Sequence, residues 1–134
     1  MRTLVLDASV VLEALLQAGP ARRLLASSDV RAPELLDLEV LSVLRRRSLA
    51  GRLPEHRAVA MLDIYRQLII ERHSTWPLLP SIWQLRHNLT AYDAAYVALA
   101  HRLDCPLVTL DQALLRAPQL PCVVEVLEEG RSDL

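Results

Sequence analysis

The sequence predicts an α/β fold in which a mostly parallel sheet is covered by helices on both faces. Short apolar runs alternate with longer segments of helical periodicity, and 52% of the residues are apolar. Strands that alternate with helices favour parallel pairing, because parallel neighbours need a long crossover connection. A chain of 134 residues can bury a core of its own, so we expect one domain over residues 1–134.

The first part of the chain contains two predicted strands with helices between them. Gly19-Pro20 ends the first helical pattern, and Pro33 stops the second strand. The elements expected here are a strand over 3–6, a helix over 10–16, one or two helical turns over 21–26 and a strand over 30–32.

A helical hairpin is expected next. Helical periodicity runs from Leu35 to Ala50 and ends at Gly51, a residue type that suits the end of a helix. Pro54 suits a first helical position, so the segment from Pro54 to Leu68 should run back beside the preceding helix.

The remainder of the chain returns to alternating strands and helices. Thr90 can cap a strongly predicted helix, and Pro106 breaks the pattern that follows it. The expected elements are a strand over 68–70, helices over 79–87 and 91–103, a strand over 107–109, a helical turn over 112–116 and a strand over 123–127 before a charged tail.

Four acidic residues stand where strands end or helices begin, beside strongly apolar sequence: Asp7, Glu39, Asp93 and Asp111. In parallel α/β sheets, sites form beyond the carboxyl ends of the strands, so all four can face one edge of the sheet. A buried carboxylate is usually paired or binds a metal. If the four converge, a divalent cation is the natural partner.

Each of these acids also has a purely structural alternative. Asp7 can cap the following helix, and Thr90-x-x-Asp93 fits a capping box. The remaining acids are expected at the surface. Asp37, for example, points about 200° around its helix from Glu39. The others in this group are Asp29, Asp63, Asp104 and Glu128.

Composition excludes several α/β families that use acids at strand ends. The chain has no lysine, which phosphate-binding P-loops, receiver domains and haloacid-dehalogenase-type phosphatases need. It has only three glycines and no GxSxG sequence, so dinucleotide binding and a serine hydrolase are not indicated.

Cys105 and Cys122 are expected as buried free thiols. No apolar run is long enough to span a bilayer, and we expect a cytoplasmic protein.

Positive charge is local, because the formal net charge is only −1. Arg45, Arg46 and Arg47, with Arg52 and Arg57, can bind RNA phosphates or form an ordinary solvated helix face. Trp76 and Trp83 are expected to pack rather than to stack on bases. The four histidines, His56, His73, His87 and His101, share no ligand spacing and are expected to be structural or exposed.

The acidic residues lie in motifs that resemble the PIN-domain nucleases, and within them the VapC-type toxins of toxin–antitoxin pairs. The resemblance covers almost the whole chain. Its most specific block is Leu89-Thr90-Ala91-Tyr92-Asp93-Ala94-Ala95-Tyr96-Val97-Ala98-Leu99-Ala100. The others are Val5-Leu6-Asp7-Ala8-Ser9, Ala32-Pro33-Glu34-Leu35 leading to Glu39, and Leu107-Val108-Thr109-Leu110-Asp111.

This resemblance implies a five-stranded parallel sheet and a Mg²⁺- or Mn²⁺-dependent endoribonuclease. Asp7, Glu39, Asp93 and Asp111 would form its acidic site, with Ser9 and Thr109 ordering that site. Some members carry a further acid where this chain has Gln112 and Ala113. The alternatives are a catalytically silent PIN-fold module that binds RNA or a protein, and a DNA-cleaving enzyme.

The resemblance also implies two kinds of protein partner. One is an antitoxin whose peptide covers the acidic cleft, and the other is a second copy of the chain. Excess apolar surface on the helical hairpin favours a homodimer. The residues expected to provide it are Val40, Leu41, Val43, Leu44, Val59, Met61, Leu62, Ile64 and Tyr65.

Overall fold

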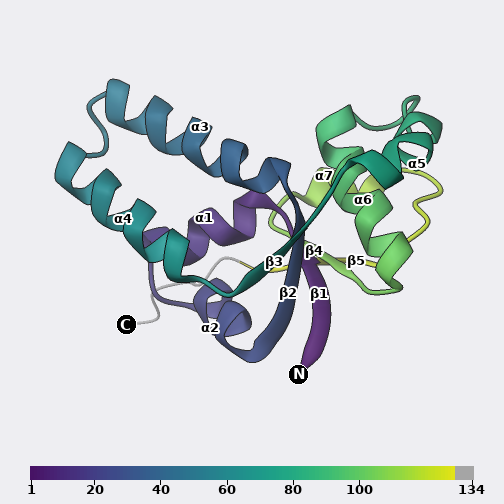
Figure 1. Cartoon of the computed structure of the whole chain (residues 1–134), viewed down its shortest axis with the longest axis horizontal. Coiled ribbons are helices and arrows are strands. Elements are labelled where there is room, and N and C mark those ends of the chain that lie inside the picture. The colour runs from purple at the N-terminus through teal and green to yellow at the C-terminus, as the bar shows by residue number, and fades with distance from the viewer. Residues whose placement is uncertain (129–134) are drawn as a thin grey trace.

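A five-stranded sheet forms the centre of the protein in a computed structural model that describes residues 1–128 (Figure 1). The order of its strands is β3-β2-β1-β4-β5, and every pairing within these residues is parallel. The strands are β1 (Arg2–Leu6), β2 (Ser28–Pro33), β3 (Ile70–His73), β4 (Leu107–Thr109) and β5 (Val124–Val126). The sheet confirms the predicted fold class, while residues 129–134 of the predicted charged tail lie outside the described residues.

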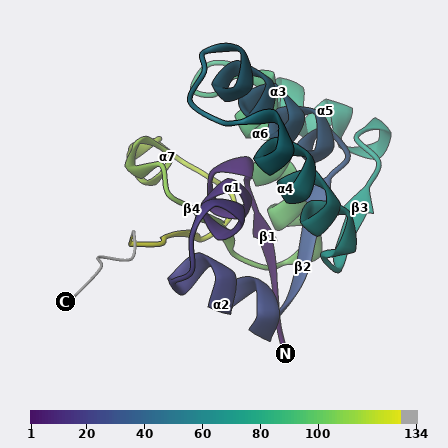
Figure 2. The ribbon, with the colours of Figure 1, turned by 90° about the vertical axis from the view of Figure 1, so that its left-hand side faces the viewer.

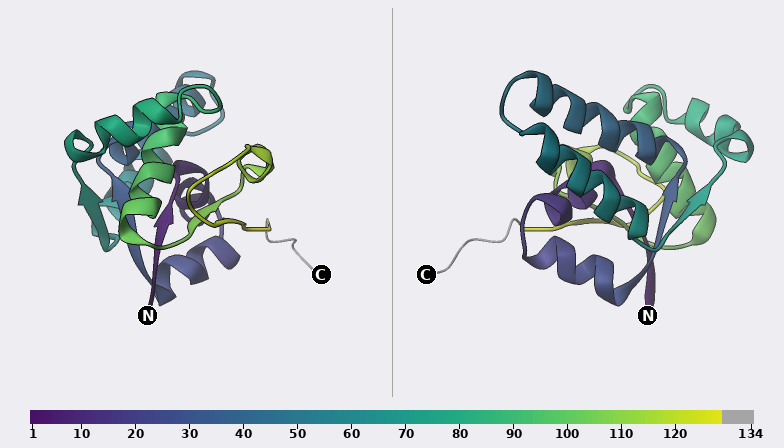
Figure 3. Two further views of the ribbon diagram at one scale, coloured as in Figure 1. Left: turned by 90° about the vertical axis from the view of Figure 1, so that its right-hand side faces the viewer. Right: turned by 60° about the vertical axis from the view of Figure 1, so that its left-hand side comes forward.

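Helices cover both faces of this sheet, as the side views show (Figures 2 and 3). One face packs against α1 (Ala8–Leu16), α2 (Pro20–Ser27), α3 (Leu35–Leu49) and α4 (Glu55–Gln67). The other packs against the 3₁₀ turn η1 (Trp76–Leu78), α5 (Leu79–Gln84), α6 (Ala91–Leu103) and α7 (Gln112–Arg116).

Strand alternation divides the apolar side chains between two cores. Leu4 and Leu6 of β1 belong to the core under α1, α3 and α4, whereas Val5 between them belongs to the core under α6. All three side chains are fully buried. Burial on both faces explains why Leu4-Val5-Leu6 is continuously apolar.

The predicted helical hairpin is present as α3 and α4. Gly51 has φ +72°, a conformation that glycine adopts without strain, and the Arg52 amide donates to the Arg47 carbonyl at 2.9 Å. Leu53 then turns into the core and α4 runs back beside α3 (Figure 3, right). The hairpin tip therefore projects away from the sheet.

The element predictions fail at two places. The bounds of the strand predicted over 68–70 are wrong, because β3 begins only at Ile70, opposite Val30, and Ile69 is 93% exposed. The helix predicted over 79–87 ends at Gln84 and continues only as turns. By contrast, β4, α6 and α7 have the predicted bounds. Within residues 1–128, no helix is both long and apolar enough to cross a membrane.

Candidate active site

The ends of β1 and β4 bring two of the predicted acids to one edge of the sheet. Leu6 pairs with Val108, so the residues that follow these neighbouring strands leave the sheet together. Asp7 is the N-cap of α1, and Asp111 is the N-cap of α7. The capping alternative is therefore correct for Asp7, and the structure shows that Asp111 is a cap as well. Capping also holds both carboxylates at the carboxyl edge of the sheet.

Hydroxyl groups hold the Asp7 carboxylate from both sides. Its Oδ1 accepts from the Ser9 amide at 3.1 Å and the Ser9 hydroxyl at 2.5 Å, and its Oδ2 accepts from the Thr109 hydroxyl at 2.5 Å. Thr109 is fully buried. The same hydroxyls accept from the next turn, Ser9 from the Leu110 amide and Thr109 from the Asp111 amide, each at 3.0 Å. The two strand ends thus form one hydrogen-bonded unit.

The other two acids reach this edge from the starts of α3 and α6. Asp93 lies in the first turn of α6, and its amide donates to the Thr90 hydroxyl at 3.2 Å. Glu39 lies just after the first turn of α3, where its Oε1 accepts from the Tyr96 hydroxyl at 2.6 Å. Tyr96 is only 2% exposed and stands one helical turn after Asp93, so it connects α6 to α3.

The pKa values show that the acids influence one another. Burial raises the pKa of Asp7, although hydrogen bonds from Ser9 and Thr109 oppose this. Burial also raises the pKa of Glu39, and the charges of Asp7 and Asp93 raise it further. For Asp93, burial is again the main cause of a raised pKa, followed by the charge of Asp111. The repulsions form a chain from Asp7 through Glu39 and Asp93 to Asp111.

The four acids do not form a closed cage. Within residues 1–128, no three His, Cys, Asp or Glu side chains lie close enough together to hold an ion between them. Asp93 and Asp111 instead line a cavity of about 270 Å³, shared with Asn88, Leu89, Ala113, Leu114, Arg116 and Ala117. Larger cavities of about 620 and 630 Å³ lie elsewhere, one beside the cysteines and one beside α2. The acidic edge is open and shallow.

Two polar residues at this edge were missed by the sequence reasoning. Tyr96 lies within the most specific motif, and its spacing of three residues from Asp93 places it on a neighbouring part of the same helix face. Arg116 is the nearest basic contributor to the acidic cavity, and no local pattern distinguishes it from the other arginines.

Asp37 lies at the surface, as expected, with 44% of its side chain exposed, but it is hydrogen-bonded and ion-paired. Its Oδ1 accepts from the Tyr65 hydroxyl at 2.6 Å and from the Arg72 guanidinium at 2.9 Å. It does face away from Glu39, as the helical geometry predicts. Asp29 is half-buried and is likewise bonded, to Thr3 and Arg31. Asp63, Asp104 and Glu128 are exposed, as expected.

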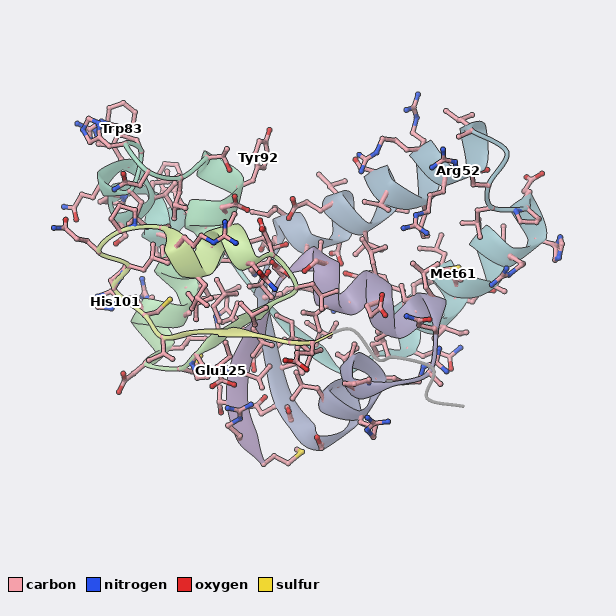
Figure 4. All side chains as sticks on the ribbon, turned by 180° about the vertical axis from the view of Figure 1, so that it is seen from behind. Arg52, Met61, Trp83, Tyr92, His101 and Glu125 are labelled. Carbon is pink, nitrogen blue, oxygen red and sulfur yellow. The ribbon has the colours of Figure 1, made fainter. Side chains whose placement is uncertain are left out.

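The tryptophans and cysteines also differ from expectation. Trp76 and Trp83 do not pack but are 79% and 67% exposed, with the Arg86 guanidinium 4.5 Å from the Trp83 ring centre. Figure 4 shows Trp83 pointing outward beyond α5. Cys105 and Cys122 are free thiols, but they are half-buried rather than buried. Three histidines are exposed, and the fourth, His73, is half-buried beside Glu71.

Comparison with known proteins gives a consistent family. The PIN domain family model matches residues 4–120. Ribonuclease VapC1 of Mycobacterium tuberculosis is 46% identical over 128 residues, which cover 92% of this chain and 96% of the relative. Ribonuclease VapC9 of the same organism is 42% identical over 124 residues, covering 92% and 98%.

Solved structures agree on the fold. The chain resembles VapBC2 from Rickettsia felis, solved with a promoter DNA fragment, with a TM-score of 0.67, 14% identity and coverage of 94% and 99%. It resembles FitAcB from Neisseria gonorrhoeae with a TM-score of 0.64, 18% identity and coverage of 90% and 95%. At these identities the likeness supports the fold alone.

Proposed function

Because the chain belongs to the PIN-domain family, and within it to the VapC ribonucleases that are toxins of toxin–antitoxin systems, we propose that Mg²⁺ or Mn²⁺ bound at its acidic edge supports RNA hydrolysis. The family membership confirms the resemblance inferred from the motifs. The proposed metal-binding and catalytic residues are Asp7, Glu39, Asp93 and Asp111.

The chemistry of the acidic edge fits a hard, hydrated cation. Carboxylate oxygens suit Mg²⁺ and Mn²⁺, and Mg²⁺ commonly uses one or two protein carboxylates while keeping several waters. An open edge without a cage of three ligands is compatible with that mode. Burial raises the pKa values of Asp7, Glu39 and Asp93, and a cation bound beside them would favour their ionised forms. When bound, the ion supplies positive charge beside the phosphate and a more acidic water.

Neighbouring side chains hold carboxylates of the acidic edge in fixed directions before substrate binds. Ser9 and Thr109 fix the direction of the Asp7 carboxylate, and Tyr96 fixes that of Glu39. Such preorganised groups need little rearrangement when charge develops in the transition state. Arg116, which lines the cavity beside Asp93 and Asp111, can donate to a phosphate oxygen. In this proposal, hydrolysis proceeds by in-line attack of water rather than by cyclisation.

The observation that carries the proposal is the placement of four carboxylates from different elements at one edge of the sheet, near enough for their charges to act on one another. Carboxylates held near one another repel, and a bound cation would relieve that repulsion. The test uses protein freed of any partner and a structured RNA. Cleavage should require Mg²⁺ or Mn²⁺, stop with a chelator and return when the metal is restored. Cleavage that survives chelation would exclude the metal mechanism.

The same preparation distinguishes the alternatives. RNA binding without cleavage under every metal condition would favour the catalytically silent module. Comparable cleavage of DNA and RNA oligonucleotides would favour a nuclease without preference for RNA. The complete set of acids at one edge supports the ribonuclease.

We also propose an antitoxin partner and a homodimer. The related structures VapBC2 and FitAcB carry the names of two-component assemblies, which supports a partner here.

The expected dimer surface needs correction, because Val40, Leu44, Met61 and Tyr65 belong to the core. Exposed apolar residues remain on the hairpin: Leu38, Leu41, Leu49, Val59 and Ile64. Sedimentation of the isolated chain tests the dimer, and co-purification with the product of a neighbouring gene tests the antitoxin. Cytoplasmic location stays a prediction.

A further inference from the structure

The tip of the α3–α4 hairpin concentrates positive charge. Residues 45–57 contain five arginines and one glutamate, in a chain whose formal net charge is −1. All five guanidinium-bearing residues are exposed, and none makes an ion pair within residues 1–128. They are Arg45, Arg46, Arg47, Arg52 and Arg57.

The distribution of charge on this part of α3 differs from that on an ordinary solvated helix face. Solvated helices commonly place acids three or four residues from their basic residues, where the charges attract. Here no acid occurs between Glu39 and Glu55. The negative end of the α3 dipole favours Arg46 and Arg47 in its last turn, but no acidic side chain among the described residues pairs with them, so their guanidinium groups stay available to an external anion.

Helical geometry connects this charge to the acidic edge. Arg46 follows Glu39 by seven residues, which is close to two turns, so the two side chains leave α3 within about 20° of each other and about 10 Å apart along the axis. Figure 4 shows Arg52 at the hairpin tip on the same upper side of the molecule as Tyr92, the neighbour of Asp93. Arg46 thus lies outward from the acidic edge on the Glu39 side of α3, and together with the other four arginines it forms what we call the hairpin row.

We propose that this hairpin row binds the backbone phosphates of RNA flanking the bond that is cut. The inference rests on the proposed ribonuclease function and adds a second contact region to it. An offset of about 10 Å along the helix is long enough for the row to contact phosphates beyond the one at the acidic edge. Guanidinium groups bind phosphate bidentately and without reading sequence.

RNA fits this surface better than an acidic protein does. The acidic edge repels the substrate backbone, and the net charge of the chain supplies no compensating long-range attraction. A nearby row of guanidinium groups offsets that repulsion and keeps the strand beside the carboxylates. An acidic partner protein at the same surface is the competing outcome of the test.

The test measures RNA affinity against salt concentration in protein silenced by Asp7→Asn. The double variant Arg46→Gln, Arg47→Gln should bind a long RNA more weakly, and its log–log salt slope should fall by about 1.4, or about 0.7 for each lost phosphate contact. The matched control is Arg23→Gln, Arg102→Gln, which removes the same charge from exposed positions on α2 and α6. Its slope should equal that of the parent protein.

Two further measurements separate the possible failures. In protein that keeps Asp7, the hairpin variant should cut a short oligonucleotide, which spans only the scissile bond, at the normal rate. If the protein without any substitution also fails to cut this oligonucleotide, the proposed function itself is refuted. Arg46→Lys, Arg47→Lys should keep most of the slope. An unchanged slope in the glutamine variant, an equal fall in the control, or weakening of protein-partner binding alone would overturn the hairpin proposal.

Discussion

The buried Tyr96 hydroxyl donates a 2.6 Å hydrogen bond to Oε1 of Glu39, across 57 residues of sequence. Glu39 has few other means of being held, because it extends from α3 toward an open edge. The hydroxyl therefore positions a carboxylate that is itself proposed to act on the metal or substrate. Tyr96 belongs to the same helix as Asp93, so one element sets the location of two acids.

Removing this hydroxyl should loosen the acidic edge without unfolding the protein. In Tyr96→Phe, we expect a fall in ribonuclease kcat of roughly tenfold, since a hydrogen bond to a charged group contributes about 1.5–3 kcal/mol. The ring still fills the core, so the melting temperature should change little. Single-turnover kinetics and thermal denaturation measure the two effects, and a variant with normal kcat would show that Glu39 needs no such support.

Neutralising Asp7 should abolish activity while preserving the fold. Asp7→Asn keeps an oxygen for the Ser9 amide but removes the charge that the proposed cation needs. Cleavage should fall by at least about a thousandfold, as for loss of a principal electrostatic group, and the far-UV circular dichroism should stay the same. Asp63→Asn, an exposed substitution on α4, serves as the control and should keep full activity.

Neutralising Asp93 should leave the metal-free protein equally stable or more stable at neutral pH. Burial, followed by the charge of Asp111, raises the pKa of Asp93, so in the folded protein its ionised form is disfavoured. The folded state then holds its proton to higher pH than the unfolded state, and this group makes stability fall as pH rises through its folded pKa.

The benefit of Asp93→Asn should therefore disappear in acid, where the wild-type carboxyl is protonated in both states. Urea denaturation of both proteins across the acidic to neutral range, with chelator present, measures this difference. A large loss of stability in the variant at neutral pH would instead show that capping of α6 is the main role of the carboxylate.

The pKa of Asp37 is shifted downward, in the opposite direction to the pKa of Glu39, two residues away. Burial opposes its ionisation, but hydrogen bonds from Arg72 and Tyr65 hold the pKa of Asp37 below its ordinary value. Because that side chain is 44% exposed, we expect Asp37→Asn to lower the free energy of unfolding by only about 1 kcal/mol. Metal-dependent cleavage should persist.

The pH dependence of Asp37 is also reversed. Since its folded pKa is lowered, its stabilisation is present above the unfolded value of 3.8 and is lost as pH falls through the folded pKa. Chemical denaturation of wild type and Asp37→Asn at several pH values should give curves that converge in acid. A difference that stays constant with pH would exclude the ion pair as its cause.

Cys122 should react slowly with alkylating reagents. Burial raises the pKa of its thiol to about 11, so only a small fraction is thiolate near neutral pH. The alkylation rate of the folded protein should rise about tenfold for each pH unit from 7 to 9. Mass spectrometry of timed samples measures this, with the urea-unfolded chain as the fast-reacting reference.

Local sequence patterns were sufficient to predict an element when its own residues determine its burial and its ends. The almost wholly apolar stretch after Thr90 made α6 and its first-turn acid predictable, and Pro106 separated α6 from β4. The location of β3 was not predictable in the same way. Its ladder begins where Ile70 meets Val30, whereas the β-branched Ile69 next to it is exposed.

By itself, the sequence determined the α/β class and the placement of four acids at strand ends and helix starts, because periodicity and chain breaks act over a few neighbouring residues. Only the tertiary structure decided which groups meet there. The hydrogen bonds of Thr109 to Asp7 and of Tyr96 to Glu39 join segments 102 and 57 residues apart. Such contacts depend on how whole helices and strands pack against one another, and no local pattern encodes that arrangement.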